Sequence, residues 1–393
     1  MGADELAALG HSSRTSRGQP RRPHGGAPPR PRTAYTQSVP RTSSTHRSRG
    51  PKHPTLADVA RAAGVDPSTV SRTLRRGEDD ARTERARRIW AVVRALDYRP
   101  NLAAAALRTN LTRLIAVFIP RLRDEVLALM YEGIEETLEA AGYQCVVLAT
   151  GDDPDVQLAK LQIALQRRVD GVLVGDAVIG SPFLARVRAA GIPCLLFNRP
   201  RRGYRSITID DREGGRLAAE HLLARAEGPL AVYGAMDHAQ NLIHRVDGFL
   251  DACRAAGREV DPELIFHGGI FAEDGLGMAE HLLALPHPPR GIFAVNDAAA
   301  VGVLGEYMRH GARPGEDVFV VGFNNVSLAR VMSVPLTTIV SPMQELGAAA
   351  ATALLDLMAG GRPTSQVMPV ELLTRASTGG PGPSAGPDAP PGV

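Results

Sequence analysis

The apolar residues between positions 55 and 96 recur at helical spacing in three short segments. Gly64 interrupts the first segment, and a charged stretch at 75–83 separates the second from the third. Amphipathic helices of this length bury their apolar faces only against one another, so the pattern predicts a compact all-α head. The apolar positions expected to face inward are Leu56, Val59, Ala60, Ala63, Val70, Leu74, Ile89, Val92, Val93 and Leu96.

After residue 111 the pattern changes to short aliphatic runs that alternate with amphipathic helices. Strands alternating with helices form parallel βαβ units, and two such sheets exceed a single core layer. The pattern therefore predicts an α/β body of two doubly wound parallel-sheet lobes with a cleft between them. Expected strands lie at 114–119, 144–149, 171–174, 194–197, 230–233, 264–266, 291–295 and 318–323, and expected helices at 132–141, 158–167, 183–190, 214–224, 245–256, 276–285 and 298–310.

Charge is distributed unevenly along the chain. The 393 residues carry a net charge of +3, but residues 1–110 hold 21 basic and nine acidic side chains, whereas residues 111–393 hold 24 and 33. A basic head on an acidic body indicates a polyanion partner for the head alone. Residues 1–53, rich in Arg, Pro, Gly and Ser, are expected to form a disordered basic arm that is either attracted to DNA or a variable extension.

Several classes of protein are excluded by composition. No apolar run approaches the roughly 20 residues that cross a bilayer, and the N-terminus has no apolar core typical of a secretory signal. Cys145, Cys194 and Cys253 lie far apart in the sequence, in a spacing that suits neither a disulfide framework nor a metal cluster. We therefore expect a cytoplasmic protein with no membrane contact and no metal or cofactor.

The segment 55–72 meets the physical requirements of a helix-turn-helix. Ala60 is small where two helices must approach, and Gly64 suits the turn. Asp66 is a good N-cap for the second helix, and Pro67 takes its first position, where the missing N–H costs nothing. Arg72 can then bond a guanine edge in a major groove. The other outward positions of that helix are Ser68, Thr69 and Ser71.

The motif Thr-x-x-Asp-Val-Ala-x-x-Ala-Gly-Val-Asp-x-x-Thr-Val-Ser-Arg at 55–72 resembles the head of the LacI/GalR family of bacterial transcription regulators, with Asp66 in place of the usual Ser. Residues 98–101 (Tyr-Arg-Pro-Asn) and the alanine-rich run after them resemble that family's hinge helix. So short a helix would fold only against its dimer mate on DNA, and the alternative is a plain linker. Leu107 stands where the family wedges a leucine into the minor groove. The resemblance also implies DNA contacts for Thr55, Pro67, Asn101 and Ala104.

The resemblance extends over residues 55–376, through residues 191–193 (Gly-Ile-Pro), 320–323 (Val-Val-Gly-Phe) and 335–338 (Pro-Leu-Thr-Thr). It implies a body like a periplasmic sugar-binding protein, in which the chain crosses three times between two lobes that clasp an effector. The implied domains are a helix-turn-helix head (54–99), a hinge (100–110), an effector-binding and dimerisation domain (111–376) and a disordered tail (377–393). The N-lobe would comprise 111–209 and 340–366, and the C-lobe 210–339 and 367–376.

Ligands of parallel sheets bind at the carboxyl ends of strands, where several polar residues are expected to lie. The family resemblance implies that Arg245 and Asn296 contact the effector, while Asp297 is expected to cap a helix. Position 324 often holds Asp in the family, and Asn324 suits an anionic or carbonyl oxygen. With residues 124–127 (Asp-Glu-Val-Leu), it resembles the gluconate-repressor branch, although any carbohydrate or sugar acid remains open. The expected effector contacts are Arg121, Asp124, Asn198, Arg245, Asn296 and Asn324.

Three functional classes are compatible with a chain of this size and composition. An enzyme is not expected, because no dinucleotide-binding turn, phosphate loop, nucleophile elbow or metal-binding His pair is present. A transport-linked binding protein would explain two lobes but requires export and leaves the head without a role. A nucleoid-associated repressor explains both parts: a homodimer on a palindromic operator, released or modulated by a sugar or sugar acid. Whether the effector is an inducer or a corepressor stays open.

Overall fold

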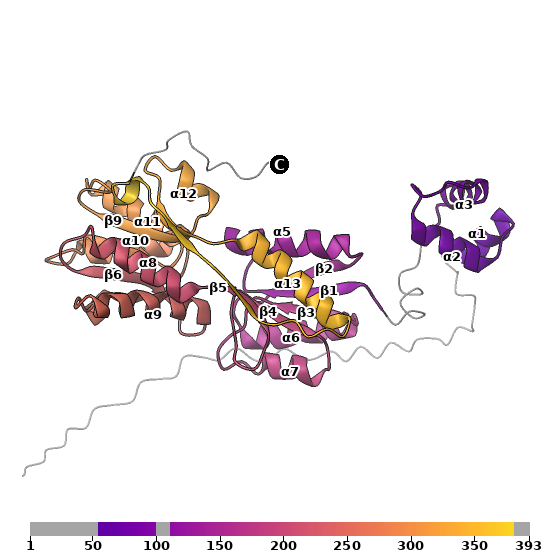
Figure 1. Cartoon of the computed structure of the whole chain (residues 1–393), viewed down its shortest axis with the longest axis horizontal. Coiled ribbons are helices and arrows are strands. Elements are labelled where there is room, and N and C mark those ends of the chain that lie inside the picture. Colours follow the sequence, from indigo (N-terminus) through magenta and orange to yellow (C-terminus); the bar gives the residue numbers. More distant parts are fainter. Residues whose placement is uncertain (1–53, 100–110, 381–393) are drawn as a thin grey trace, which may run out of the picture. The chain divides into compact units, whose positions relative to one another are not determined.

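The chain divides into two separate units, a head and a body, and the boundary lies between Tyr98 and Arg99. The structure is a computed structural model that describes residues 54–99 and 111–380 (Figure 1). The expected basic arm (1–53), the hinge helix (100–110) and most of the expected tail lie outside these residues.

The head consists of three helices, as predicted. They are α1 (Leu56–Ala63), α2 (Pro67–Arg76) and α3 (Glu84–Ala95). Gly64 ends α1 in the left-handed conformation at φ 63°, which glycine adopts without strain, and Asp66 caps α2 by accepting a hydrogen bond from the Ser68 N–H at 2.8 Å. The head is closed by one small apolar cluster, formed by Val59, Ala60, Ala63, Val70, Ile89, Val93 and Tyr98.

The N-lobe of the body is a six-stranded parallel sheet in the order β11-β5-β4-β3-β1-β2. Helices α5 and α13 cover one face and α6 and α7 the other (Figure 1). The strands are β1 (Leu114–Ile119), β2 (Gln144–Ala149), β3 (Gly171–Val174), β4 (Cys194–Phe197), β5 (Ser206–Ile209) and β11 (Gln366–Met368), and the helices are α5 (Glu125–Ala140), α6 (Pro154–Gln166), α7 (Phe183–Ala189) and α13 (Met343–Met358).

The C-lobe repeats this plan with the order β12-β10-β9-β8-β6-β7. Among its described strands only β12 runs antiparallel, against β10, which is a small departure from the all-parallel prediction. The strands are β6 (Leu230–Ala235), β7 (Ile265–His267), β8 (Gly291–Ala294), β9 (Phe319–Asn324), β10 (Thr337–Val340) and β12 (Glu371–Leu373), and the helices are α8 (Asp211–Leu223), α9 (Gln240–Ala255), α10 (Ala272–Leu283), α11 (Asp297–Arg309) and α12 (Ser327–Val331), with short 3-10 turns η1 (Pro262–Leu264) and η2 (Ala376–Thr378).

The chain passes three times between the lobes, after β5, after β10 and after β11. Two of the crossings touch, because the Asp210 N–H donates to the Met368 carbonyl at 2.9 Å. In each lobe the order of the first five strands is that of a flavodoxin-like doubly wound sheet, with the ligand expected at the carboxyl ends. The two doubly wound lobes that the sequence pattern predicted are therefore present.

The structure departs from the predicted elements in several places. Helix α5 begins at Glu125 rather than at 132, because Val126, Leu127 and Met130 supply an additional buried turn. Strands β5, β10, β11 and β12 were not predicted, because each contains a polar residue and forms no continuous apolar run. The ordered chain also continues past residue 376 to Gly380. The Ser377 side chain accepts a hydrogen bond from the Thr337 N–H at 2.8 Å in the C-lobe core, so the predicted tail starts too early.

Three pairs of helices pack with their backbones in direct contact. In each pair, a glycine on each helix faces a backbone carbonyl oxygen of the other helix. A Cβ added at any of these glycines would lie 1.9–2.1 Å from that oxygen. Only glycine permits this approach, which is the tightest constraint on the packing of each lobe. The pairs are Gly133 and Gly347 between α5 and α13, Gly215 and Gly248 between α8 and α9, and Gly275 and Gly302 between α10 and α11.

A carboxyl group is buried in the C-lobe core. Asp297, the first residue of α11, is fully buried and accepts hydrogen bonds from the Val326 N–H at 2.8 Å and the Thr338 hydroxyl at 2.5 Å. It thereby joins α11 to the loop after β9 and to β10. Burial raises the pKa of Asp297 to about 7, against the smaller opposite effect of these hydrogen bonds.

The glycine contacts predict opposite effects for two substitutions one turn apart on α11. Gly302→Ala places a methyl group 1.9 Å from the Ala272 carbonyl, whereas an added Cβ at Gly305 meets nothing within 4 Å. We expect Gly302→Ala to cost about 1–3 kcal/mol through overpacking, and Gly305→Ala to be neutral or to stabilise by about 0.4–1 kcal/mol. Urea denaturation of both variants measures this difference. Equal midpoints would contradict the proposed packing role of Gly302.

The buried carboxyl predicts a pH dependence of stability. Asp297 has a folded pKa of about 7 and an ordinary value of 3.8, so the folded state holds the proton more tightly. Its contribution is complete below about pH 4 and is lost as the pH rises towards 7. The variant Asp297→Asn keeps the shape of the side chain but has no group that titrates at this position. The difference in unfolding free energy between wild type and Asp297→Asn should therefore change between pH 4 and pH 7 and become constant above it; a constant difference across that range would refute the assignment.

Candidate DNA-binding surface and effector cleft

The second helix of the head presents most of its predicted DNA-contacting residues to solvent. Pro67, Ser68 and Arg72 are exposed on α2, while Thr69 and Ser71 are half-buried. The N-terminal turn of α2 is held in place by the Asp66 cap, and Val70 anchors the opposite face in the core of the head. Helix α2 therefore exposes a polar face, as a recognition helix does.

Thr55 has a structural role that the sequence analysis did not anticipate. Its hydroxyl accepts from the Asp58 N–H at 3.3 Å and donates to the Asp58 carboxylate at 2.7 Å, while the Thr55 N–H donates to the same carboxylate. This reciprocal capping box fixes the start of α1. The other predicted DNA contacts, Asn101, Ala104 and Leu107, lie outside the described residues.

All six predicted effector contacts lie around one cleft in the body. They come from the carboxyl ends of β1, β4 and β9, from the start of α11 and from α9, in agreement with the rule that ligands bind there. Both lobes contribute to the cleft. Its lining comprises Pro120, Arg121, Asp124, Val126, Leu127, Asn198, Arg199, Asn241, Leu242, Arg245, Ile270, Asn296 and Asn324.

Arg245 is the most constrained of these residues. Its Nε donates to Asp211 at 2.8 Å, its Nη1 to the Val295 carbonyl at 2.6 Å and its Nη2 to Asn324 Oδ1 at 3.4 Å. The guanidinium stacks on the Phe323 ring, with Cζ 3.6 Å from the centroid. The sequence analysis placed Arg245 against an effector, whereas the structure first shows it as a buried link between strands and helices.

The asparagines and Asp124 also carry structural bonds. Asn296, rather than Asp297, is the N-cap of α11: its Oδ1 accepts from the Ala299 N–H, and its Nδ2 donates to the Ile270 carbonyl at 2.7 Å. The expectation that Asp297 caps this helix was therefore wrong by one residue. Asp124 caps α5, and burial raises the pKa of its carboxyl group. Asn198 and Asn324 adopt positive φ angles of 64° and 102°.

Positive φ in residues other than glycine costs energy and tends to persist at functional sites. A third residue in this conformation, Asp152 (φ 63°), follows β2 beside the cleft. Its carboxylate pairs with Arg199 Nη1 at 2.5 Å and with Arg121 Nη2 at 2.7 Å, and His238 Nε2 lies 3.6 Å away. Arg199 and Arg121 hold the pKa of Asp152 below its usual value, although burial opposes them.

The sequence analysis missed Asp152, Arg199 and Asn241. A signal was available for two of them, because Asp152 and Arg199 follow β2 and β4 just as Asn198 and Asn324 follow or end their strands. Asn241 lies on a helix, with no such signal. Two buried polar atoms in this group, Arg199 Nε and Asn241 Oδ1, have no hydrogen-bond partner in the described part of the protein. Groups of this kind indicate a place where a ligand can supply the missing bonds.

The lobes touch across the cleft. Asn241 Nδ2 donates to Asn198 Oδ1 at 3.2 Å, and the Ile179 N–H donates to the His238 carbonyl at 3.2 Å. Elsewhere Ser327 donates to the Glu125 carboxylate, from its N–H at 2.9 Å and its hydroxyl at 2.6 Å. The space left in the cleft is about 40 Å³, which holds only a few waters on the usual measure. The structure therefore represents a closed form, which must open to admit a sugar-sized molecule.

Other kinds of site are not found among the described residues. Within residues 54–99 and 111–380 no three His, Cys, Asp or Glu side chains are grouped to hold a metal ion. In the same ranges no helix combines the length and apolarity needed to traverse a lipid bilayer.

Comparisons with known proteins agree with this description. Residues 55–101 match the model of bacterial regulatory proteins of the lacI family, and residues 219–378 match that of the periplasmic binding protein-like domain. The HTH-type transcriptional regulator DegA of Bacillus subtilis (strain 168) is 30% identical over 332 residues, which cover 82% of this chain and 98% of DegA. The HTH-type transcriptional repressor PurR of Aliivibrio salmonicida (strain LFI1238) is 29% identical over 329 residues, with the same coverage.

A solved structure is similar to this chain over most of its length. The lac repressor dimer bound to operator and the anti-inducer ONPF superposes with a TM-score of 0.73 at 25% identity, covering 83% of this chain and 99% of the repressor. This chain covers nearly the full length of each of these three proteins, so the similarity includes both the head and the body. With its helix-turn-helix head and two-lobed periplasmic-binding-protein-like body, this chain belongs to the lacI family of bacterial regulatory proteins.

Proposed function

We propose that this protein is a homodimeric repressor of carbohydrate or sugar-acid utilisation genes, which leaves a palindromic operator when a small polar effector binds between its lobes. The observation that carries the proposal is the combination, in one chain, of an exposed recognition helix and a closable polar cleft. An isolated binding protein would need only the second of these. The exposed helix is accounted for if the head binds DNA.

The head supports sequence-specific binding through α2. Ser68 lies in the first turn of α2 and Arg72 about one turn after it. Both side chains are exposed, so both can reach base edges in a major groove. Pro67, Thr69 and Ser71 would contact the phosphates or bases nearby, and Leu107 with Asn101 and Ala104 would read the minor groove. Head contacts of this kind give affinity that falls with salt concentration.

The cleft supports a small, hydroxylated and anionic effector. Its lining includes three arginines, four asparagines and Asp124, but no aromatic side chain. A purine or pyrimidine base is usually held by stacking, and the described lining offers no ring for this purpose. A sugar acid matches the donors better, because its carboxylate can pair with Arg121 or Arg199 and its hydroxyls with the amides.

A homodimer is supported by apolar side chains left exposed on the body. Leu122 is 63% exposed, Leu328 47% and Val331 68%. Leu122 precedes α5 in the N-lobe, and the other two lie on α12 in the C-lobe. Both lobes therefore carry apolar surface that a second copy can cover. Movement of one lobe against the other would change how the apolar surfaces of two copies meet. It would thereby change the distance and orientation between the two heads of the dimer.

The effector would act through a coupling free energy. An effector that binds one arrangement of the lobes more tightly than the other increases the population of the first arrangement. The free energy of operator binding then changes by about 1–3 kcal/mol in typical cases. The interlobe bonds of Asn198, Glu125 and His238 are the contacts that such a movement would make or break.

The first test is a footprint on DNA upstream of the protein's own gene and its neighbours, at fixed salt, with a panel of sugars and aldonates. We expect a two-fold symmetric protected site that one compound abolishes. Compound binding to the body without any protected site would instead favour a binding protein, and would refute the repressor.

Arg72 predicts a loss of sequence discrimination. On the footprinted operator, Arg72→Ala should weaken binding by about 1–3 kcal/mol and relax the preference at one base pair in each half-site. The control is Arg87→Ala, which removes the same charge from the exposed surface of α3. Gel-shift titrations with each operator base pair changed in turn measure both effects. A uniform loss in both variants would show that Arg72 acts only through its charge.

Arg121 predicts a selective loss of effector affinity. Its guanidinium is about one-fifth exposed at the cleft, so Arg121→Gln removes one charged bond without stranding the Arg245 pair. Loss of a charge-assisted bond, worth about 1.5–3 kcal/mol, should weaken the response to the effector at least tenfold. Operator affinity without effector should stay unchanged. Arg186→Gln, exposed on α7 away from the cleft, is the matched control; an unaltered dose response in Arg121→Gln would remove Arg121 from the site.

A further inference from the structure

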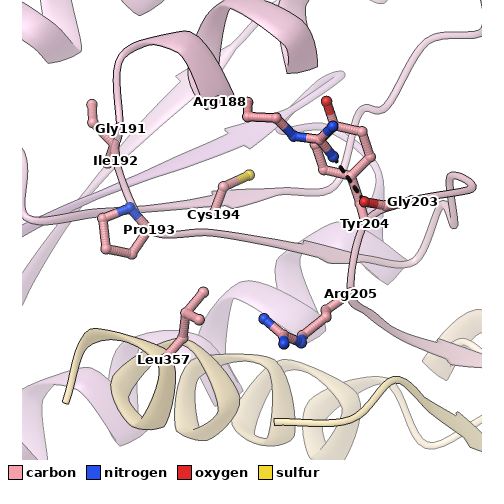
Figure 2. A pocket seen from close by; sticks show the side chains of 9 residues that line it. All are labelled: Arg188, Gly191, Ile192, Pro193, Cys194, Gly203, Tyr204, Arg205 and Leu357. Atoms are coloured by element: carbon pink, nitrogen blue, oxygen red, sulfur yellow. Dashed lines mark hydrogen bonds between the residues drawn. The ribbon is translucent and has the colours of Figure 1, made fainter. Parts of the chain in front are cut away.

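A second pocket lies on the N-lobe, at the opposite end of its sheet from the cleft. It is formed where β4 and β5 begin and where α13 ends, and its volume is about 670 Å³. That volume lies within the range of small-molecule sites. Figure 2 shows the lining residues, which are Arg188, Gly191, Ile192, Pro193, Cys194, Gly203, Tyr204, Arg205 and Leu357.

One wall of this N-lobe pocket is held rigidly. Arg188, near the end of α7, donates from Nη2 to the Gly203 carbonyl at 2.8 Å, the bond drawn in Figure 2. Its guanidinium also stacks on the Tyr204 ring, with Cζ 4.2 Å from the centroid. These two contacts use one donor of the fork and leave the others free to bind a ligand. A cation that is positioned in advance loses little entropy on binding.

The second cation is Arg205, whose exposed side chain forms no hydrogen bond or ion pair with the described residues. Residues 177–209 contain six arginines and no Asp or Glu, although the body as a whole has an excess of acidic residues. Nothing in this segment therefore neutralises Arg188 and Arg205. Burial raises the pKa of the Cys194 thiol to about 12, so this thiol is uncharged at neutral pH.

The rest of the lining is apolar. Ile192 and Pro193 line it from the loop before β4, and Leu357 from α13 (Figure 2). A purely inorganic anion would use the arginines but none of this surface. The combination instead suits a molecule with an anionic group at one end and a hydrocarbon portion at the other. Because the site is concave and of limited volume, a small molecule fits it better than a nucleic-acid backbone or a folded partner.

We propose that this N-lobe pocket is a second ligand site, which binds a small organic carboxylate or phosphate through Arg188 and Arg205 and its hydrocarbon portion through Ile192, Pro193 and Leu357. The site is separate from the effector cleft and shares no residue with it. It does not depend on which effector the cleft binds.

The test uses the full-length protein and three probes: benzoate, hexanoate and phenyl phosphate, with inorganic phosphate as the charge-only comparison. Ligand-observed NMR and calorimetry measure saturable binding. We expect at least one organic probe to bind at least tenfold more tightly than inorganic phosphate, and an Arg188→Gln/Arg205→Gln double variant to lose at least tenfold in affinity. Arg186→Gln on the same helix and outside the lining should bind as wild type does.

Binding must also be assigned to the correct pocket, because the cleft contains arginines too. The cleft variant Arg121→Gln should bind the probes as tightly as wild type, and its defect should remain confined to the effector response. Binding lost in Arg121→Gln but kept in the double variant would place the probes in the cleft and overturn the proposal. No saturable binding of any organic probe to a folded wild-type protein would overturn it as well. Failure of the repressor hypothesis would leave both results unchanged.

Discussion

The buried charge of Arg245 is the interaction on which the rest of the cleft depends. The residue is 2% exposed, and an uncompensated charge at that depth costs several kcal/mol. It is compensated by Asp211 on α8, by the Val295 carbonyl after β8 and by Asn324 at the end of β9. Three elements are therefore joined to α9 at one point. The network therefore holds Arg245 and Asn324, two of the residues that line the cleft.

Much of this architecture could be predicted from periodicity. Runs such as 114–119 and 171–174 were predicted with correct bounds, since a buried parallel strand has a clear apolar signature. The rule that ligands bind at the carboxyl ends of strands, together with the family resemblance that supplied Arg245 and Asn296, then indicated six polar residues that line one cleft. What a pattern could not provide was the partner of each side chain. Asn296 and Asp297 are adjacent, and only their three-dimensional surroundings show that the first caps α11 and the second lies in the core.

The closed form explains why several cleft residues are engaged with one another rather than with solvent. Asn198 bonds to Asn241 of the other lobe, and Asp152 is shared by Arg121 and Arg199. A ligand that enters must replace some of these bonds, so its affinity reflects a difference between two sets of polar contacts. Arg199 Nε and Asn241 Oδ1, which lack partners among the described residues, are the places where such an exchange gains most.

The crossings between the lobes lie next to these same residues. Asp211, which pairs with Arg245, directly follows the first crossing, and the Ser341 hydroxyl, within the second, donates to Asn324 Oδ1 at 3.2 Å. The crossings and the polar groups of the cleft are thus joined by hydrogen bonds. Under the proposed function, a substitution at position 324 that changed the preferred effector would also change the bonds that hold Arg245 and Ser341. In this lineage, specificity and sensitivity would therefore diverge together.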